Sequence, residues 1–160
     1  KTLYKYVFSI ELQQELYQAA KQRFRDDKRV HILQGESHQQ LPRILKQLPE
    51  AAVFWLDGHY SGQFQGVQTA KGSIENPVVE ELELILAHRQ KTGLKHIILI
   101  DDARQYRGKG FCLDDAQRNI MKSREFCDYP SLDELLDLVC RFNPQYYFMV
   151  HQDYIIIHES

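Results

Sequence analysis

The sequence predicts a single α/β domain with a mostly parallel sheet, helices on both faces and a C-terminal antiparallel hairpin. Short apolar runs alternate with helical periodicities along most of the 160 residues, which is typical of parallel strands connected by helices. The last two apolar runs instead flank a short polar turn at Gln152-Asp153, which predicts a hairpin. The length suffices for one domain with a buried core, and no internal repeat is visible. We therefore expect residues 1–160 to form one domain.

The first half of the chain supplies three strands and two helices. We expect strands at residues 6–10, 30–33 and 53–56, each of them a short apolar run. Between the first two, apolar side chains recur every four residues and mark a helical face: Leu12, Leu16, Ala20 and Phe24. Ser37 and Gln40 predict a capping box at the start of the second helix. The apolar face behind that box is Leu41, Ile44, Leu45 and Leu48.

The second half continues the alternation and then closes it. Asn76-Pro77 predicts a helix start with proline at the first helical position, and Gly93 predicts its end. Its stripe is Val78, Leu82, Ile85 and Leu86. Residues 96–100 form a continuously apolar run, as expected of a strand covered on both faces. Ser131 and Glu134 cap a last helix with the stripe Leu132, Leu135, Leu136, Val139 and Phe142, and residues 146–150 and 154–157 form the hairpin.

Composition excludes several classes of partner. The formal net charge of −2 gives no basic field for a nucleic-acid backbone, so we expect no nucleic-acid partner. No apolar run approaches the roughly 20 residues that a membrane span requires, and the N-terminal residues lack a signal-peptide pattern. The three cysteines are widely spaced and suit reduced thiols rather than a disulfide frame. We expect a cytoplasmic protein without a membrane partner.

Acidic residues follow each of the first four predicted strands. Glu11 follows the first, Glu36-Ser37 the second, Asp57-Gly58-His59 the third and Asp101-Asp102 the fourth. Parallel strands bring these ends to one rim, where carboxylates repel one another unless a cation, a donor or a proton intervenes. Long loops, residues 59–75 and 105–129, follow the third and fourth strands, and ligands bind at this edge of open α/β sheets. We interpret both loops as functional, and residues 105–129 as a mobile lid or acceptor-binding segment.

Each acid also has a purely structural interpretation. Glu11 and Glu36 could complement a helix dipole, Asp57-Gly58 could be a turn, and Asp101-Asp102 could cap the next segment. The joint pattern favours chemistry. An acid after an early strand suits the two hydroxyls of a ribose, and three aspartates suit Mg²⁺. His59 could then remove a proton from a substrate hydroxyl held near that cation.

The strand ends resemble a known family. VFSIE, ILQGES, FWLDGHYSG and HIILIDDAR occur in that order, followed by the YPSL helix and the final hairpin. This series resembles class I S-adenosylmethionine-dependent methyltransferases, which have a Rossmann-like sheet, and is closest to the metal-dependent sugar O-methyltransferases of the macrocin and novobiocin type. The resemblance covers nearly the whole chain from Val7 onward. It implies O-methyl transfer from S-adenosylmethionine to a small hydroxylated acceptor, a sugar or natural product, with Mg²⁺ or Mn²⁺.

The resemblance also implies roles for individual residues. Glu11 matches the acid that binds the cofactor's ribose, Glu36 and Ser37 match residues at the adenine edge, and Asp57 borders the cofactor as well. The family's metal ligands correspond to Asp57, Asp101 and Asp102. His59 stands where the family has a second acid, and is the implied general base. Tyr60 and Arg104 lie beside the site and are implied substrate contacts.

The sequence departs from the family at its start. The family's first strand and glycine-rich turn have no counterpart here, so the chain resembles the C-terminal part of a longer protein. In the family that strand lies between the strands ending at Glu11 and Asp57. We therefore expect these two strands to leave a slot that residues upstream of Lys1 fill.

Other functions remain open from the sequence. A methyltransferase-like binding module without turnover would share these features, and Glu11 would also suit the NAD ribose of an oxidoreductase. A hydride-transfer site does not need clustered acids, which argues against the oxidoreductase. A receiver domain also clusters aspartates, but its acidic pair precedes its lone aspartate, the reverse of the order here. The acceptor and the oligomeric state, homo-oligomers included, are not determined by the sequence.

Overall fold

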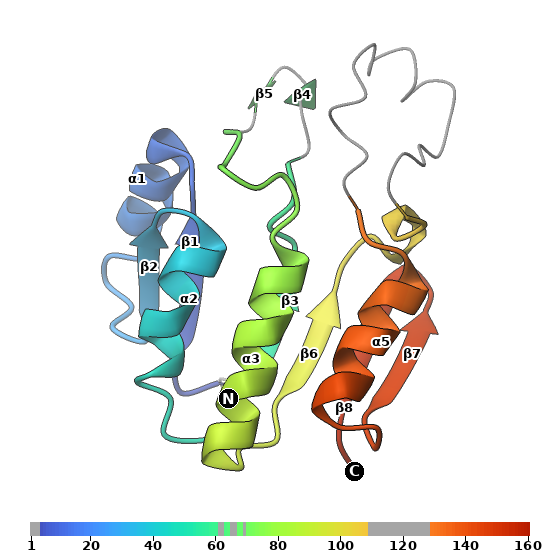
Figure 1. Ribbon diagram of the computed structural model, residues 1–160. Coiled ribbons are helices and arrows are strands. Elements are labelled where there is room, and N and C mark those ends of the chain that lie inside the picture. The colour runs from blue at the N-terminus through green and yellow to red at the C-terminus, as the bar shows by residue number, and fades with distance from the viewer. Residues whose placement is uncertain (1–3, 61–62, 65–66, 69, 109–128) are drawn as a thin grey trace.

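A computed structural model describes residues 4–60, 63–64, 67–68, 70–108 and 129–160 (Figure 1). Strands β1 (Val7–Glu11) and β2 (Val30–Gln34) pair in parallel, with Val7 opposite Val30 and Glu11 opposite Gln34. A second sheet has the order β3-β6-β8-β7. Its members are β3 (Val53–Leu56), β6 (Ile97–Ile100), β7 (Tyr147–His151) and β8 (Tyr154–His158). A short antiparallel pair, β4 (Gln63–Phe64) and β5 (Val67–Gln68), lies in the loop after β3.

The four-stranded sheet matches the predicted topology. β3 and β6 are parallel, β8 is antiparallel to β6, and β7 is antiparallel to β8. Gln152 adopts a left-handed conformation with φ 53° in the turn between the last two strands. The closing hairpin therefore adds one antiparallel strand to an otherwise parallel arrangement, as the sequence predicts.

Four α-helices accompany the strands: α1 (Gln14–Arg23), α2 (Ser37–Leu45), α3 (Val78–Thr92) and α5 (Leu132–Phe142). In Figure 1, α2, α3 and α5 lie in front of the strands and α1 lies behind β1 and β2. Helices thus occupy both sides of the molecule, although α1 buries none of its side chains.

Helix ends follow the sequence with two corrections. The predicted capping box at Ser37 and Gln40 is wrong, because Glu36 takes the extended N-cap position and Ser37 is already helical. Pro77 precedes the first helical residue of α3 instead of occupying it. The capping box at Ser131 and Glu134 is confirmed, with both of its hydrogen bonds formed at 3.2 and 2.6 Å.

The main core lies between the sheet and helices α3 and α5. Strand residues Leu56, Ile98, Ile100, Ile155 and Ile157 pack there against helix residues such as Leu82, Ile85, Leu86, Leu135 and Val139. The opposite face of the same sheet is exposed, with Trp55 54% and Tyr147 52% accessible. Ile97 is 43% exposed on that face. The expectation that its strand is covered on both faces is therefore wrong for the part of the chain that the structure describes.

The two parallel sheets do not join. Among the described strands β1 pairs only with β2, and β3 pairs on one side only, with β6. The strands that end at Glu11 and Asp57 therefore leave facing edges without a ladder partner in the described residues. The slot predicted between them is consistent with this arrangement.

Most of the predicted lid at residues 105–129 lies outside the described residues, as does part of the loop at residues 59–75. A 3-10 turn, η1 (Ala103–Gln105), ends at the first residue of the former segment. No helix in the described ranges is both long enough and apolar enough to cross a bilayer.

Candidate functional site

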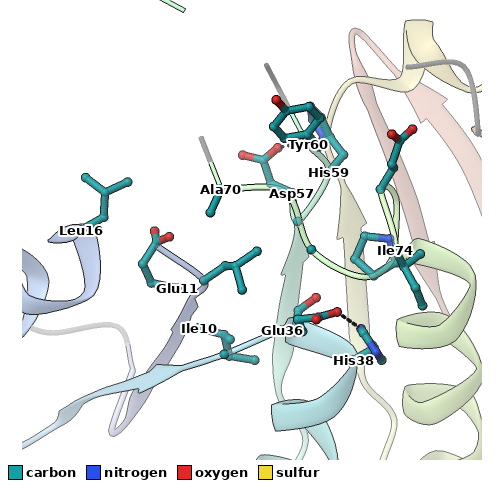
Figure 2. Close-up of a pocket in the computed structure, with 17 residues that line it drawn as sticks. Ile10, Glu11, Leu16, Glu36, His38, Asp57, His59, Tyr60, Ala70 and Ile74 are labelled. Carbon is teal, nitrogen blue, oxygen red and sulfur yellow. Dashed lines mark ion pairs between the residues drawn. The ribbon is translucent and has the colours of Figure 1, made fainter. Parts of the chain in front are cut away.

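A cavity of about 220 Å³ opens at the carboxyl ends of β1, β2 and β3 (Figure 2). We call it the rim pocket. Its lining includes all four predicted cofactor residues, Glu11, Glu36, Ser37 and Asp57, together with the predicted base His59 and the predicted substrate residue Tyr60. These residues are up to 49 positions apart in the chain, so the parallel topology brings them together, as the sequence predicted.

Glu11 ends β1 at the edge of the rim pocket (Figure 2). Its Oε1 accepts a hydrogen bond from the backbone N–H of Gln13 at 2.8 Å. This bond holds the carboxylate at the N-terminal end of α1, in agreement with the interpretation that Glu11 supports the start of a helix. The same residue also lines the cavity, where a carboxylate can accept hydrogen bonds from a diol.

Glu36 and Ser37 begin α2 and line the same cavity. The Glu36 carboxylate accepts a hydrogen bond from the hydroxyl of Ser73 and lies 3.7 Å from Nδ1 of His38. The bond from Ser73 is the main cause that lowers the pKa of Glu36. It also ties the described end of the loop after β3 to the pocket.

The Asp57-Gly58-His59 segment turns sharply at the end of β3. A side chain at Gly58 would meet Glu81 and Ser37, each at 3.3 Å from an added Cβ. Glycine is thus required here by close approach, which lets the chain pass over the start of α2 and α3. This turn carries Asp57 and His59 to the rim.

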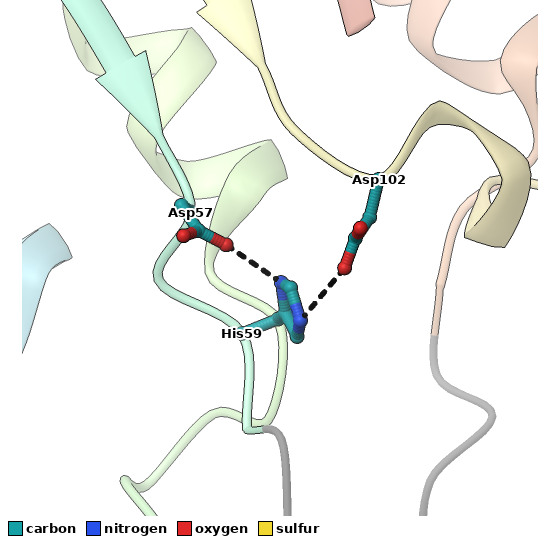
Figure 3. Close-up of side chains that lie close together, drawn as sticks. All are labelled: Asp57, His59 and Asp102. Carbon is teal, nitrogen blue, oxygen red and sulfur yellow. Dashed lines mark ion pairs between the residues drawn. The ribbon is translucent and has the colours of Figure 1, made fainter. Parts of the chain in front are cut away.

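Asp57, His59 and Asp102 form the only group of three or more potential metal ligands in the described residues (Figure 3). One ligand atom from each lies within 4.8 Å of the other two. Nδ1 of His59 lies 3.5 Å from Asp57 Oδ1, and Nε2 lies 3.3 Å from Asp102 Oδ2. Burial raises the pKa of Asp57, His59 lowers it, and Asp101 and Asp102 raise it further.

Asp101 was expected to join Asp57 and Asp102 as a third ligand, but it is not a member of this group. Its Oδ1 accepts the backbone N–H of Asp102 at 2.8 Å. Asp102 has φ 56° and ψ 45°, a left-handed conformation that Asp tolerates better than most residues. Asp101 therefore shapes the turn that presents Asp102.

Two tyrosines, Tyr106 and Tyr129, pack beside the group of Asp57, His59 and Asp102. The Tyr129 ring centroid is 5.7 Å from that of His59 and 5.3 Å from that of Tyr106. Burial raises the pKa of both hydroxyls, so both rings stay neutral at physiological pH. His59 therefore has the Tyr129 ring beside it and one carboxylate near each ring nitrogen.

Glu81 lies beneath the pocket and was not singled out by the sequence. It is 3% exposed, and burial raises its pKa to about 7, an effect that a hydrogen bond with Ser37 partly offsets. Its place within the apolar stripe of α3, next to Leu82, hides it among ordinary helix residues. A charged residue on the buried side of a helix is the signal that could have found it.

The two predicted substrate residues are placed differently. Tyr60 lines the rim pocket, and its backbone N–H donates to Glu75 O at 2.8 Å. Arg104 does not line the pocket; its Nη1 binds Asp102 Oδ1 at 2.7 Å and also pairs with Asp153. Arg104 thus neutralises one oxygen of Asp102 from the side of the hairpin.

Sequence reasoning missed the apolar part of the rim pocket. Leu12 and Leu16 were predicted only as part of a helical face, but both line the cavity, and Leu16 is 41% exposed. Ala70 and Ile74 reach the cavity from the loop after β3 (Figure 2). No periodicity marks loop residues, so nothing in the sequence pointed to the last two.

Comparison with solved structures identifies the fold. No protein-family description matches the sequence, and no curated protein matches it. Among solved structures, the SAH-bound methyltransferase PaMTH1 of Podospora anserina aligns with 97% of this chain at 14% identity and a TM-score of 0.55. A protein from Staphylococcus aureus described as a caffeoyl-CoA O-methyltransferase aligns with 97% at 16% identity and a TM-score of 0.52. The chain therefore has the class I methyltransferase fold.

The present chain spans 61% of the length of PaMTH1 and 65% of the Staphylococcus aureus protein. At this identity the likeness concerns the fold. The strand order β3-β6-β8-β7 and the separate β1-β2 pair are the parts of that fold that the described residues supply.

Proposed function

We propose that this chain is the C-terminal part of an S-adenosylmethionine-dependent methyltransferase that transfers a methyl group to a hydroxyl of a small acceptor. The observation that carries the proposal is the rim pocket, where acids from three strand ends line one cavity in a fold shared with an SAH-bound methyltransferase. The acceptor class, a sugar or hydroxylated natural product, comes from the sequence resemblance.

The residues of the rim pocket fit the adenosine half of such a cofactor. Glu11 offers carboxylate oxygens to the ribose diol, and Glu36 with Ser37 offers polar atoms at the base edge. Ile10, Leu12 and Ile74 offer an apolar surface for the base, and other lining residues, Leu16 and Ala70, extend it. The family that the sequence resembles holds the methionine half with a glycine-rich turn, which has no counterpart in these 160 residues.

When bound, S-adenosylmethionine would supply a methyl carbon attached to its sulfonium sulfur. The acceptor oxygen would form a C–O bond to that carbon while the C–S bond breaks. The electron pair of the C–S bond would stay on sulfur, and the hydroxyl proton would pass to a base. The chain's part is to hold donor and acceptor in line and keep water away. Tyr60 borders the pocket beside Asp57, and Tyr129 borders His59. The sequence argument gives the proton to His59.

A divalent cation, Mg²⁺ or Mn²⁺, is part of this proposal. It would offset the carboxylates at the rim and lower the pKa of an acceptor hydroxyl bound to it. Asp57 and Asp102 lie on the two sides of His59 and fit this role, and Asp101 was the third ligand expected from sequence. The donor set of hard oxygens with one imidazole suits a divalent ion.

The runner-up is a binding module with this fold that holds the cofactor and does not turn it over. A nicotinamide-dependent oxidoreductase is a weaker alternative, because the acid cluster at His59 has no use in hydride transfer. The two leading hypotheses make the same prediction for cofactor binding and different predictions for product.

A transfer assay on the full natural protein separates them. The protein is incubated with S-adenosylmethionine labelled in its methyl group, Mg²⁺ or Mn²⁺, and a panel of sugars, catechols and other hydroxylated compounds. We expect labelled methyl ether on at least one hydroxylated acceptor, and a fall of at least tenfold in rate when EDTA removes the cation. The Asp102→Asn variant should match the EDTA result.

Cofactor binding without transfer to any acceptor would support the binding module. Equal rates with and without EDTA would remove the cation from the proposal and leave methyl transfer in place. Failure to bind the cofactor would overturn the proposal as a whole.

A further inference from the structure

Residues 70–75, the last part of the loop after β3, form part of the wall of the rim pocket (Figure 2). We call these residues the strap. The backbone N–H of Tyr60 donates to Glu75 O at 2.8 Å, which fastens the strap to the turn after β3. Within the strap, Lys71 forms an ion pair with Glu75 at 2.5 Å. The strap residues that line the cavity are Ala70, Gly72, Ile74 and Glu75.

Ser73 belongs to the strap but does not line the cavity. Its hydroxyl donates a hydrogen bond to Oε2 of Glu36, which does line it. The strap backbone approaches the same oxygen, since a Cβ added to Gly72 would lie 3.4 Å from Glu36 Oε2 and 3.5 Å from Leu12 Cδ2. Ser73 therefore contacts a predicted adenine-edge residue from outside the pocket.

The side-chain contacts of Glu36 involve one of its two carboxylate oxygens. Ser73 donates to Oε2, and Nδ1 of His38 lies 3.7 Å from Oε2 as well (Figure 2). Among the residues that the structure describes, no hydrogen bond or ion pair reaches Oε1. Oε1 is therefore the oxygen that Glu36 can offer to a ligand in the pocket.

The hydrogen bond from Ser73 also favours the charged form of Glu36. This bond is the main cause that lowers the pKa of Glu36 below its usual 4.5, so the carboxylate is ionised at neutral pH. An ionised carboxylate accepts hydrogen bonds and cannot donate them. At the edge of a bound base it would match an amino group, and hydrogen bonds to charged acceptors are roughly twice as strong as neutral ones.

We propose that Ser73 is a positioning residue of the cofactor site, which holds Glu36 by Oε2 so that Oε1 faces the pocket and selects a base that carries an amino group. The proposal rests on the proposed function for the identity of the ligand, S-adenosylmethionine or its product SAH. Ser73 acts through Glu36 and does not touch the base. A site with an oriented acceptor rejects an analogue that lacks the matching N–H donor, because the acceptor is then left without a partner.

Calorimetry on the full natural protein tests this selection with two ligands, SAH and its 6-deamino analogue, in which hydrogen replaces the amino group of adenine. We expect the unaltered protein to bind SAH at least tenfold more tightly than the analogue. Ser73→Ala should lower this affinity ratio at least threefold, whereas Ser73→Thr, which keeps the hydroxyl, should retain it. Ser9→Ala, at an exposed serine of β1 outside the pocket lining, should leave the ratio unchanged. Equal affinities in the unaltered protein, or an unchanged ratio in Ser73→Ala, would overturn the proposal.

A double-mutant comparison separates positioning from packing. Glu36→Ala should bring the affinity ratio close to one, and adding Ser73→Ala to Glu36→Ala should change the ratio no further. A Ser73 substitution that only loosens the strap would weaken both ligands in equal proportion. An effect of Ser73→Ala on the ratio that persists without Glu36 would contradict the role of Ser73.

The contact itself can be tested without any ligand. Nuclear magnetic resonance of the Glu36 side-chain carboxyl carbon, followed through a pH titration, reports its pKa. Ser73→Ala should raise this pKa toward 4.5, because the main cause of the shift is removed, and Ser73→Thr should not. An unchanged pKa in Ser73→Ala would show that the hydrogen bond does not hold Glu36.

The two proposals fail in different ways. SAH binding with an affinity ratio that Ser73→Ala leaves unchanged refutes the role of Ser73 and leaves the methyltransferase proposal standing. A raised Glu36 pKa in Ser73→Ala, in a protein that does not bind SAH, refutes the methyltransferase proposal and the base selection that rests on it.

Discussion

At the residue scale, the site depends on a buried carboxyl, Glu81, that was not among the predicted site residues. Glu81 packs under Gly58 and bonds to Ser37, so it supports both the turn after β3 and the start of α2. Burial raises its pKa to about 7, above the 4.5 of an exposed glutamate. Its protonated form therefore suits the folded state, and its charge opposes folding.

Replacement of Glu81 by glutamine should change how stability depends on pH. A folded pKa above the unfolded value gives stability that is present below pH 4.5 and lost as pH rises through 7. The loss amounts to about 3 kcal/mol in the free energy of unfolding for this shift. Glu81→Gln should remove that slope in urea unfolding of the full protein between pH 5 and 8. Glu83→Gln, an exposed neighbour on α3, should keep it, and an unchanged slope in Glu81→Gln would contradict the burial argument.

His96 should produce the opposite slope. The ring is 3% exposed, its Nδ1 accepts the backbone N–H of Ala52 at 3.1 Å, and its Nε2 lies 3.0 Å from Nδ1 of His88. Because Nδ1 accepts, the hydrogen belongs on Nε2, and the ring is neutral. Burial, together with the nearby charges of His88 and Arg89, lowers the pKa of His96 to about 4 from 6.5.

A depressed histidine pKa means that the unfolded chain binds the proton first as pH falls. Stability should therefore fall between pH 6.5 and pH 4, by about 3 kcal/mol in full. His96→Asn, whose side-chain oxygen can still accept from Ala52, should lose this acid slope in urea titrations. His151→Gln, at an exposed histidine of β7, should retain it. An acid slope that persists in His96→Asn would assign the effect to other groups.

At the element scale, helix α3 is followed by a C-cap residue, Gly93, in the left-handed conformation, which glycine adopts without steric strain. Gly93 has φ 78° and ψ 0°, and its N–H donates to Arg89 O at 2.8 Å. An added Cβ there would meet no atom within 4 Å, so a substitution tests backbone conformation without a clash.

Gly93→Ala should cost about 1 kcal/mol in the free energy of unfolding, because alanine pays for the left-handed conformation. Gly93→Asn should cost less, since asparagine tolerates that conformation better. Chemical denaturation of the three proteins measures both differences. Equal stability of the alanine variant would show that the helix end relaxes at no cost.

Elements with a strong periodicity or a specific cap were predictable. The strand at residues 53–56 and the ends of α3 at Gly93 and of α5 at Ser131 follow from local sequence alone. The capping box at Ser37 was not correct, because Glu36 takes the N-cap position and its carboxylate accepts a hydrogen bond from Ser73, 37 positions away, instead of from the helix N–H groups. Local sequence alone did not rank these two adjacent cap candidates.

The site was predictable where topology decides and unpredictable where side-chain geometry decides. Acids after parallel strands had to share one rim, and Glu11, Glu36 and Asp57 do line one cavity. Which of two adjacent aspartates faces His59 depends on the left-handed backbone of Asp102, and no spacing rule gives that. The burial of Glu81 was hidden for a similar reason, because it requires the glycine-dependent turn above it.

At the scale of the whole molecule, one sheet face and two strand edges are uncovered in the described residues. The exposed face presents Val53, Trp55, Ile97, Tyr147 and Met149, each at least 40% accessible. β1 and β3 add unpaired edges of the kind that recruit other strands. The sequence expectation places a further strand of a longer protein in that slot.

A polypeptide of these 160 residues alone should therefore self-associate. Light scattering coupled to gel filtration at micromolar concentrations should show species larger than a monomer. The double variant Trp55→Lys, Tyr147→Lys should shift the distribution toward monomer, because charges on that sheet face oppose its packing against a second copy. The control double variant Gln90→Lys, Leu136→Lys, altered at exposed positions of α3 and α5, should not shift the distribution. A monomeric isolated chain would show that the exposed face and edges do not drive association.

Binding of SAH to the full natural protein is the most direct test of the central claim, that the rim pocket holds the adenosine of a methyl-donor cofactor. Titration calorimetry should detect binding, and Glu11→Gln should weaken it at least tenfold because a charged acceptor for the ribose diol is lost. Glu15→Gln, at an exposed acid one turn along α1, should bind SAH as the unaltered protein does. Absence of SAH binding, or an affinity that Glu11→Gln leaves unchanged, would contradict the account.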